Sequence, residues 1–156
     1  MNLVSSLLEL SHVALDVEAG DKKALFQRAG AMLEGASGLS QGQVTESLLA
    51  RERLGSTGLG QAVAIPHGRV KGLRTAVGAF LRLRIPIPFD APDSQPVSLV
   101  FVLLVPERAS DLHLQILSEL AQMFSDRELR RQLTAAPNAL SAQRLIVGWQ
   151  THAPKT

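Results

Sequence analysis

The run at 97–105, Val-Ser-Leu-Val-Phe-Val-Leu-Leu-Val, constrains the fold more than any other part of this chain. It is apolar at every position but one, and it is far shorter than the roughly 20 residues that a membrane-spanning helix needs. A strand with apolar side chains on both faces has to be covered on both faces. The run therefore predicts a central β-strand between two layers, without insertion into a membrane.

Helices are predicted for the part of the chain that comes before the sheet. Residues 3–10 have helical spacing and predict a short N-terminal helix, and 12–17 predict a strand. Asp21 is a good N-cap for one longer helix, and Ser40 for a second that runs to about residue 53. These two helices are candidates for one of the covering layers.

The rest of the chain predicts more strands and then helices only. Besides 97–105, the predicted strands are 62–65 and 76–85, with a Pro-rich extended loop at 86–92. The last third predicts a helix with an apolar stripe from Leu112 to Phe124, a short helix around 129–133 and a helix capped by Asn138. We expect an α/β fold, a three-layer α/β/α sandwich with a central mixed β-sheet and a helical C-terminal third.

Composition sets limits on the class of protein. A length of 156 residues and an apolar content of 46% favour one globular domain, which we assign to residues 1–150, with 151–156 as a flexible tail. The absence of cysteine excludes a disulfide scaffold and a thiolate metal site, and it agrees with a cytoplasmic location. The formal charge of +2 is too balanced to argue for nucleic acid. Basic residues do follow residue 67, and they form either a solvated surface or a face that attracts an acidic partner: Arg69, Lys71, Arg74, Arg82 and Arg84.

The segment 51–69 holds the residues with chemical potential. Arg51 stands at a predicted helix end, and a loop with three glycines and the hydroxyls of Ser56 and Thr57 follows it. Glycines let backbone N–H groups converge on an anion, and hydroxyls and a guanidinium add further donors. His67 comes next, where we expect the short strand to stop, between Pro66 and Gly68. A histidine beside an anion cradle indicates chemistry on a phosphoryl group.

His67 is the candidate nucleophile. An imidazole attacks a phosphoryl group only when it is neutral, and an ordinary pKa of about 6.5 leaves it mostly neutral at pH 7. The alternative is a polar side chain at a strand end that bonds to a backbone carbonyl. Two histidines could also hold a metal, but a catalytic zinc needs at least one more ligand and no metal-binding spacing occurs. We therefore expect no metal and no organic cofactor.

These motifs resemble the enzyme IIA domains of the bacterial phosphoenolpyruvate phosphotransferase system. Arg-Glu-x-Leu-Gly-Ser-Thr-Gly-x-Gly…Ala-Ile-Pro-His-Gly, at 51–68, is similar to the active segment of the fructose/mannitol superfamily, and within it to the nitrogen-regulatory branch. Further matches are Pro-Ile-x-Phe-Asp-Ala-x-Asp-x-Gln-Pro-Val at 86–97, Leu-Leu-Val-Pro-Glu at 103–107 and His113-Leu. The similarity covers about 3–146. One departure is Ala62, where a glycine is more usual.

The resemblance implies a role for each site residue. His67 accepts a phosphoryl group, and a second histidine, His113, lies beside it. Arg51 stands at the rim of the pocket and makes a charge-assisted bond to the phosphoryl group. Ser56, Thr57 and Gly68 are expected to bind phosphoryl oxygens.

Structural alternatives stay open for these residues. Ser110 or Asp111 caps a helix and puts His113 in its first turn, where an anion is favoured, but His113 could also be a plain surface histidine. Arg51 could pair with a nearby carboxylate of its own helix. Ser56 and Thr57 could only shape the turn. Glu52 and Arg53 are expected to support the helix end or the surface, and Glu107 is a weak candidate for the pocket rim.

The resemblance also implies partners and a use. The phosphoryl donor would be a histidine phosphocarrier protein, and the targets would be regulated transporters or kinases in nitrogen and potassium metabolism. One alternative is a sugar-specific component that passes phosphate to a separate permease. The other is a regulatory binding module that transfers nothing. No nucleic acid and no direct membrane insertion are expected.

Overall fold

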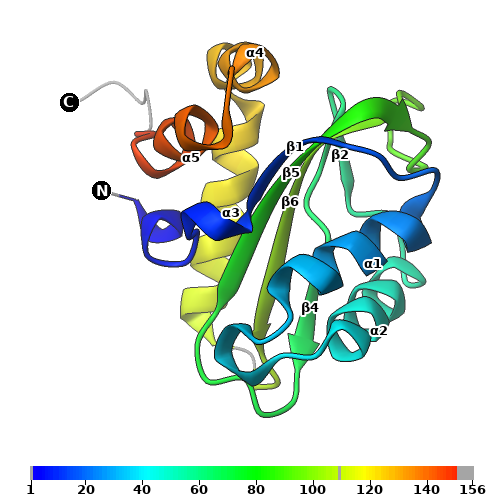
Figure 1. Cartoon of the computed structure of the whole chain (residues 1–156), viewed down its shortest axis with the longest axis vertical. Helices are drawn as coiled ribbons and strands as arrows, with labels where there is room; N and C mark the ends of the chain where they lie inside the picture. The colour runs from blue at the N-terminus through cyan, green and yellow to red at the C-terminus, as the bar shows by residue number, and fades with distance from the viewer. Residues whose placement is uncertain (1, 109, 151–156) are drawn as a thin grey trace.

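The computed structural model describes residues 2–108 and 110–150. Within these ranges the chain forms one sheet of six strands, both parallel and antiparallel. The strands are β1 (Val13–Val17), β2 (Gly58–Gly60), β3 (Val63–Ala64), β4 (His67–Val70), β5 (Val77–Ile87) and β6 (Val97–Pro106). One face is covered by α1 (Lys22–Leu33) and α2 (Gln41–Glu52), and the other by α3 (Asp111–Ser125), α4 (Arg127–Ala135) and α5 (Ala139–Val147) (Figure 1). The predicted α/β/α sandwich is confirmed.

The central strand β6 explains the apolar run at 97–105. It pairs antiparallel with β5 on one side and parallel with β3 and β4 on the other. Side chains alternate across a strand. Accordingly Val100, Val102 and Leu104 belong to the core under α1 and α2, whereas Phe101 and Leu103 belong to the core under the C-terminal helices. Both faces are buried, as the sequence predicted.

Two short strands, β3 and β4, pair one after the other with the same side of β6, and the chain between them leaves the ladder. β3 stops at Ala64, and His67 is the first residue of β4, so the expectation that His67 stands where a strand stops is wrong. The break falls at Ile65 and Pro66, because proline has no N–H for a sheet ladder. The carbonyl of Pro66 still accepts from Leu103 N at 2.9 Å, so the two pieces stay in one line.

Two further boundaries differ from the sequence prediction. Part of the glycine loop is a short strand, β2, which pairs antiparallel with β3. The strand predicted at 76–85 continues to Ile87, and it includes Pro86 because the pairing of β5 with β6 is irregular between Arg82 and Ile87. Proline is tolerated in a strand at such an irregularity.

The predicted helix caps are confirmed. Asp21 accepts from Ala24 N, and Asn138 accepts from Ser141 N. Ser40 and Gln43 form a complete capping box at the start of α2. Capping is a local interaction between residues two or three positions apart, so the sequence shows it directly.

The predicted helix at 3–10 is instead two short 3-10 turns, η1 (Leu3–Ser6) and η2 (Leu10–His12). A third such turn, η3 (Ala36–Gly38), joins α1 to α2. The Glu119 carboxylate of α3 accepts from the N–H groups of Leu3 and Val4, each at 3.1 Å. These contacts with α3 hold the chain start in place of a longer helix. The predicted tail, 151–156, lies outside the described residues.

The β2–β3 turn holds two consecutive non-glycine residues in the left-handed region. Gln61 has φ 56° and Ala62 has φ 65°. This region is costly for any residue with a Cβ, by about 1–2 kcal/mol, whereas glycine adopts it readily. The turn gives a physical reason for the expectation of a glycine at position 62.

Ala62→Gly is therefore expected to raise the free energy of unfolding by about 0.5–1 kcal/mol, the strain relieved less the added chain entropy of glycine. Urea denaturation measures it. Ala31→Gly, exposed in the last turn of α1, is the matched control and should lower the free energy of unfolding by about 0.5–1 kcal/mol. A loss of stability in both variants would contradict the strain at position 62.

Arg82 of β5 caps the C-terminal end of α4 from another layer. Its Nη1 donates to the carbonyls of Leu133, Thr134 and Ala136 at 3.0, 3.3 and 2.8 Å. The last carbonyls of a helix have no partner within the helix. The side chain of Arg82 is only 14% exposed, so its replacement would take a charged donor from all three carbonyls, of which that of Leu133 keeps a bond from Ala136 N at 3.4 Å.

We expect Arg82→Met to lower the free energy of unfolding by about 2 kcal/mol, the usual value of hydrogen bonds to a charged group. Arg84→Met, two positions along the same strand, removes an exposed pair with Glu18 and should change stability by less than about 0.5 kcal/mol. Thermal or urea unfolding compares the two. Equal losses would show that Arg82 contributes no more than a surface charge.

Candidate active site

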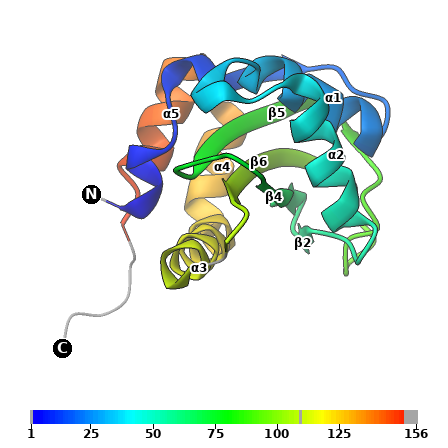
Figure 2. The same cartoon turned by 90° about the horizontal axis from the view of Figure 1, so that it is seen from below.

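A cleft of about 560 Å³ opens at the edge of the sheet beside β4. Its walls come from the C-terminal half of α2, from β4 and β6, and from the first half of α3 (Figure 2). Arg51, His67, Gly68 and His113 all line it. In the sequence these four predicted site residues span 62 positions, from Arg51 to His113, and the fold brings them together in one cleft.

The strand β4 points its side chains alternately to the two faces of the sheet. Val70 belongs to the core under α1 and α2, and a Cβ on Gly68 would come within 2.1 Å of Ser47 Oγ of α2. His67 therefore points to the opposite face, toward α3. Only glycine at position 68 lets α2 pack this close to β4, so Gly68 has a packing role whatever it binds.

One ring nitrogen of His67 is held by the backbone. Nδ1 lies 2.9 Å from the carbonyl oxygen of Ile65. Because a carbonyl only accepts hydrogen bonds, Nδ1 carries the proton and Nε2 keeps the lone pair. The break in the strand at Ile65 and Pro66 supplies this carbonyl. A hydrogen bond to a backbone carbonyl was also expected if His67 were only a structural polar residue. Here the same bond leaves Nε2 free to act as a nucleophile.

The surroundings of His67 favour the neutral ring. Burial lowers its pKa below 6.5, and the positive charge of Arg51 lowers it further, whereas the hydrogen bond to Ile65 and the charge of Glu52 act to raise it. Burial is the largest cause and the net pKa is lowered. The imidazole is thus neutral at pH 7, as an attacking nitrogen has to be.

Arg51 lies one residue before the end of α2 and its guanidinium lines the cleft. Nη1 donates to the carbonyl of Gly55 at 2.9 Å. This bond uses one of five N–H donors. The ion pair within the helix, left open by the sequence, does not occur among the described residues, where Arg51 bonds to a carbonyl instead.

His113 is the third residue of α3, and Ser110 caps that helix. Between the two caps left open by the sequence, the structure selects Ser110, whose Oγ accepts from His113 N at 3.4 Å. His113 is half-buried in the cleft wall, and its Nδ1 is buried without a hydrogen-bond partner among the described residues. It is not a plain surface histidine.

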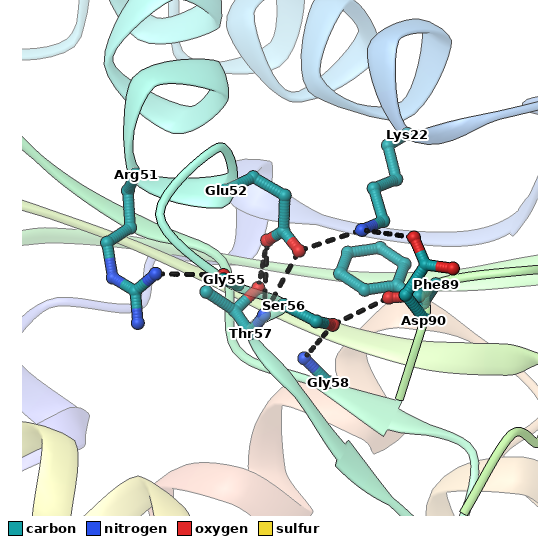
Figure 3. A network of polar contacts seen from close by, with 9 residues as sticks. All are labelled: Lys22, Arg51, Glu52, Gly55, Ser56, Thr57, Gly58, Phe89 and Asp90. Carbon is teal, nitrogen blue, oxygen red and sulfur yellow. Dashed lines mark hydrogen bonds and ion pairs between the residues drawn. The ribbon is translucent and has the colours of Figure 1, made fainter. Parts of the chain in front are cut away.

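Ser56 and Thr57 do not line the cleft, and their hydroxyls are already bonded inside the protein. Ser56 Oγ donates to the carbonyl of Phe89 at 2.6 Å, and Thr57 Oγ1 donates to Glu52 Oε1 at 2.6 Å (Figure 3). These contacts favour the turn-shaping alternative. Binding of phosphoryl oxygens by these two hydroxyls stays a prediction that the arrangement does not support.

Glu52 supports the helix end as predicted. Its side chain is 6% exposed, and the carboxylate pairs with Lys22 Nζ at 2.9 Å. Glu107, the weak candidate for the rim, is exposed and is not part of the cleft wall.

Sequence reasoning missed the apolar rim of the cleft. Leu54 is 84% exposed and Leu114 is 65% exposed, and both line the cleft. Leu112, expected on the buried stripe of α3, is 51% exposed, whereas the stripe that is buried starts at Ile116. The sequence did hold one signal of an exposed apolar rim: Leu114 lies outside the apolar stripe of its helix.

Two kinds of site find no support in residues 2–108 and 110–150. No group of three or more His, Cys, Asp or Glu side chains there could hold a metal ion. Within the same ranges, every helix is too short or too polar to span a bilayer.

The fold and the cleft define a small α/β protein with a neutral, oriented imidazole in an open hollow. Comparisons give its relatives. Residues 6–147 match the family described as phosphoenolpyruvate-dependent sugar phosphotransferase system, EIIA 2. The chain belongs to this family.

Among its relatives is a nitrogen regulatory protein of Pseudomonas aeruginosa, 39% identical over 137 residues, which are 87% of this chain and 89% of that protein. The crystal structure of nitrogen regulatory protein IIA-Ntr from Neisseria meningitidis matches with a TM-score of 0.88 and 52% identity, over 93% of this chain and 99% of that one. The fructose-specific EIIABC component of Bacillus subtilis is 31% identical over 134 residues, 85% of this chain and 21% of that protein. The resemblance predicted from the sequence is confirmed.

The pKa of His67 should respond to the charge of Arg51. Arg51→Met removes a positive charge that lowers the pKa of the imidazole, so the midpoint should rise in the variant. The measurement is an NMR titration of the His67 ring protons. Arg53→Met is the control, since Arg53 is exposed and does not line the cleft, and it should leave the midpoint unchanged; a fall in the Arg51 variant would contradict the assignment.

Proposed function

We propose that this chain is a phosphocarrier of the phosphotransferase system, which accepts a phosphoryl group on His67 from a histidine phosphocarrier protein. We further propose that it serves as a nitrogen-regulatory IIA component. The observation that carries the proposal is the His67 ring, with Nδ1 held by Ile65 and Nε2 left as the nucleophile in a cleft that also holds Arg51 and His113.

The transfer is a displacement at phosphorus. The Nε2 lone pair of His67 forms the new N–P bond while the N–P bond of the donor phosphohistidine breaks, and its electron pair returns to the donor ring. His67 gains positive character during this step, which the carbonyl of Ile65 stabilises through Nδ1–H. No metal or organic cofactor takes part in the proposed step.

Arg51 and His113 are the groups proposed to hold the phosphoryl oxygens. Phosphoryl transfer depends on positioning and charge stabilisation more than on covalent help from the protein. A guanidinium offers a planar fork to two oxygens at once. A neutral imidazole at the start of α3 offers a further donor, and the N–H of Gly68 stays a predicted contact.

The rim of the cleft suits a protein donor. Leu54 and Leu114 stand exposed on opposite walls, on the α2 and α3 sides, and Arg69 adds a positive charge. Exposed apolar side chains around a pocket mark surfaces that bind proteins. The positive rim would favour an approaching phosphate. Because phosphoenolpyruvate is made inside cells, the proposal places the chain in the cytoplasm.

The regulatory output is proposed to be phosphorylation-dependent binding to transporters or kinases of nitrogen and potassium metabolism. A phosphoryl group brings a charge of about −1.5 to −2 to the cleft, beside Arg51 and Arg69. A partner that reads this rim would distinguish the two forms. The likeness to proteins named nitrogen regulatory protein supports this use.

A sugar-specific role is the second candidate, since the Bacillus subtilis relative is named a fructose-specific component. In that case the phosphoryl group of His67 would pass to a permease and then to sugar. A regulatory module without transfer is the remaining alternative, in which His67 would stay unmodified.

Incubation with a histidine phosphocarrier protein, enzyme I and phosphoenolpyruvate should add one phosphoryl group, located on His67 by mass spectrometry. His67→Ala should abolish the labelling, and His113→Ala should slow it by about 10²-fold or more, the usual effect of removing a group that stabilises the transferring charge. The measurement is the rate of phosphoprotein formation. Stoichiometric labelling of the His67→Ala protein would overturn the assignment.

His12→Ala, a buried histidine of η2 outside the cleft, controls for the loss of an imidazole as such and should label at the parental rate. Added fructose or mannitol permease separates the two uses. Formation of sugar phosphate would favour the sugar-specific role, and none would be expected of a regulatory component.

A further inference from the structure

The end of α2 sends two adjacent charged side chains in different directions. Successive residues of a helix are about 100° apart around its axis. Arg51 reaches toward the cleft, and Glu52 reaches toward α1 on the other side (Figure 3). The side chain of Glu52 is 6% exposed, and a buried charge of this kind is unfavourable unless it is paired and hydrogen-bonded.

Both oxygens of Glu52 have partners outside α2. Lys22 Nζ of α1 pairs with Oε2 at 2.9 Å and lies 4.7 Å above the ring of Phe89. Thr57 donates twice, through Oγ1 at 2.6 Å and through its N–H at 3.0 Å. Thr57 is itself only 6% exposed. Glu52 thus ties the glycine loop, residues 55–60, to the end of α2 and to α1.

The other side of the glycine loop rests on the segment after β5. Ser56 bonds to the carbonyl of Phe89, a Cβ on Gly58 would meet Ala91 Cβ at 2.9 Å, and Gln61 N donates to Asp93 at 2.8 Å. Contacts thus recur along the whole loop. The motif at 86–97, which the transfer step does not use, supports the glycine loop.

Gly55 connects the glycine loop to the cleft through Arg51. Its carbonyl accepts from Arg51 Nη1 at 2.9 Å. Gly55 has φ 151°, and nothing lies within 4 Å of the place where a Cβ would stand. Its N–H donates to the carbonyl of Glu52 at 3.1 Å. Its position therefore depends on the end of α2 and on the residues that follow, and Thr57, two positions on, is bonded to the Glu52 side chain.

We propose that Glu52 and Thr57 are positioning residues for the phosphoryl transfer. They anchor the glycine loop so that the carbonyl of Gly55 fixes the guanidinium of Arg51 in the cleft. The proposal rests on the proposed function, and it gives the loop a purpose other than that of an anion cradle. Displacement of a positioned group by about 1 Å can slow a reaction by about 10²-fold, so the effect falls on the transfer rate rather than on donor docking.

Thr57→Val tests this anchor, because it keeps the shape of the side chain and removes the hydroxyl. We expect the maximal rate of His67 phosphorylation to fall by about 10-fold, with the KM for the charged histidine phosphocarrier protein changed by less than about two-fold. Thr57→Ser keeps the hydroxyl and should restore the rate. Thr45→Val is the matched control, since Thr45 of α2 bonds only to the carbonyl of Gln41, and it should transfer at the parental rate.

A double-mutant cycle with Arg51→Met separates positioning from direct contact. If Thr57 acts through Arg51, Thr57→Val should cost less than about two-fold in the Arg51→Met background. Glu52→Gln, a second route to the same loop, should behave in the same way. Equal losses with and without Arg51 would overturn the proposal, as would a parental rate in both loop variants or a change in KM alone.

The parent chain keeps the two hypotheses apart. If the parent is not phosphorylated on His67, the proposed function fails. If the parent is phosphorylated and both loop variants match it, the positioning role fails while the function stands. Circular dichroism melts of every variant show whether a lost rate reflects unfolding; a folded Thr57→Ser that stays as slow as Thr57→Val counts against the hydroxyl.

Discussion

The break between β3 and β4 is the constraint on which the site depends. Pro66 has no N–H for the ladder, and at this point the chain uses the carbonyl of Ile65 to hold His67 Nδ1. The ladder resumes at once, with His67 opposite Leu103 of β6. The imidazole is thus attached to the central strand of the sheet and still reaches a cleft. One hydrogen bond decides its tautomer, and burial sets its pKa below the usual value.

The two charged residues at the end of α2, Arg51 and Glu52, have different roles. Arg51 belongs to the cleft, and Glu52 belongs to a buried network with Lys22 and Thr57. Their charges act in opposite directions on the pKa of His67. Burial, the largest cause, outweighs the charge of Glu52, so the net pKa of the imidazole is lowered. The same pair of residues therefore serves both the electrostatics of the cleft and the shape of the loop beside it.

Membership of the EIIA 2 family accounts for the fold, but it does not choose a partner. Relatives with names as different as nitrogen regulatory protein and fructose-specific component match nearly the same part of the chain. A difference in use between such proteins has to come from what surrounds the shared fold. In this chain the surroundings are Leu54, Leu114 and Arg69, three exposed side chains at the mouth of the cleft.

The sequence by itself determined the order of most elements, the helix caps, the buried central strand and the histidine motif, because each rests on residues close together in the chain. It also determined the family, through motifs that span most of the length. The tertiary structure alone decided that His67 begins a strand, that the hydroxyls of Ser56 and Thr57 face the protein, and that Leu112 and Leu114 are exposed. These outcomes depend on partners 5 to 33 positions away in the loop and on the strand and helix that happen to lie alongside, which local patterns do not encode.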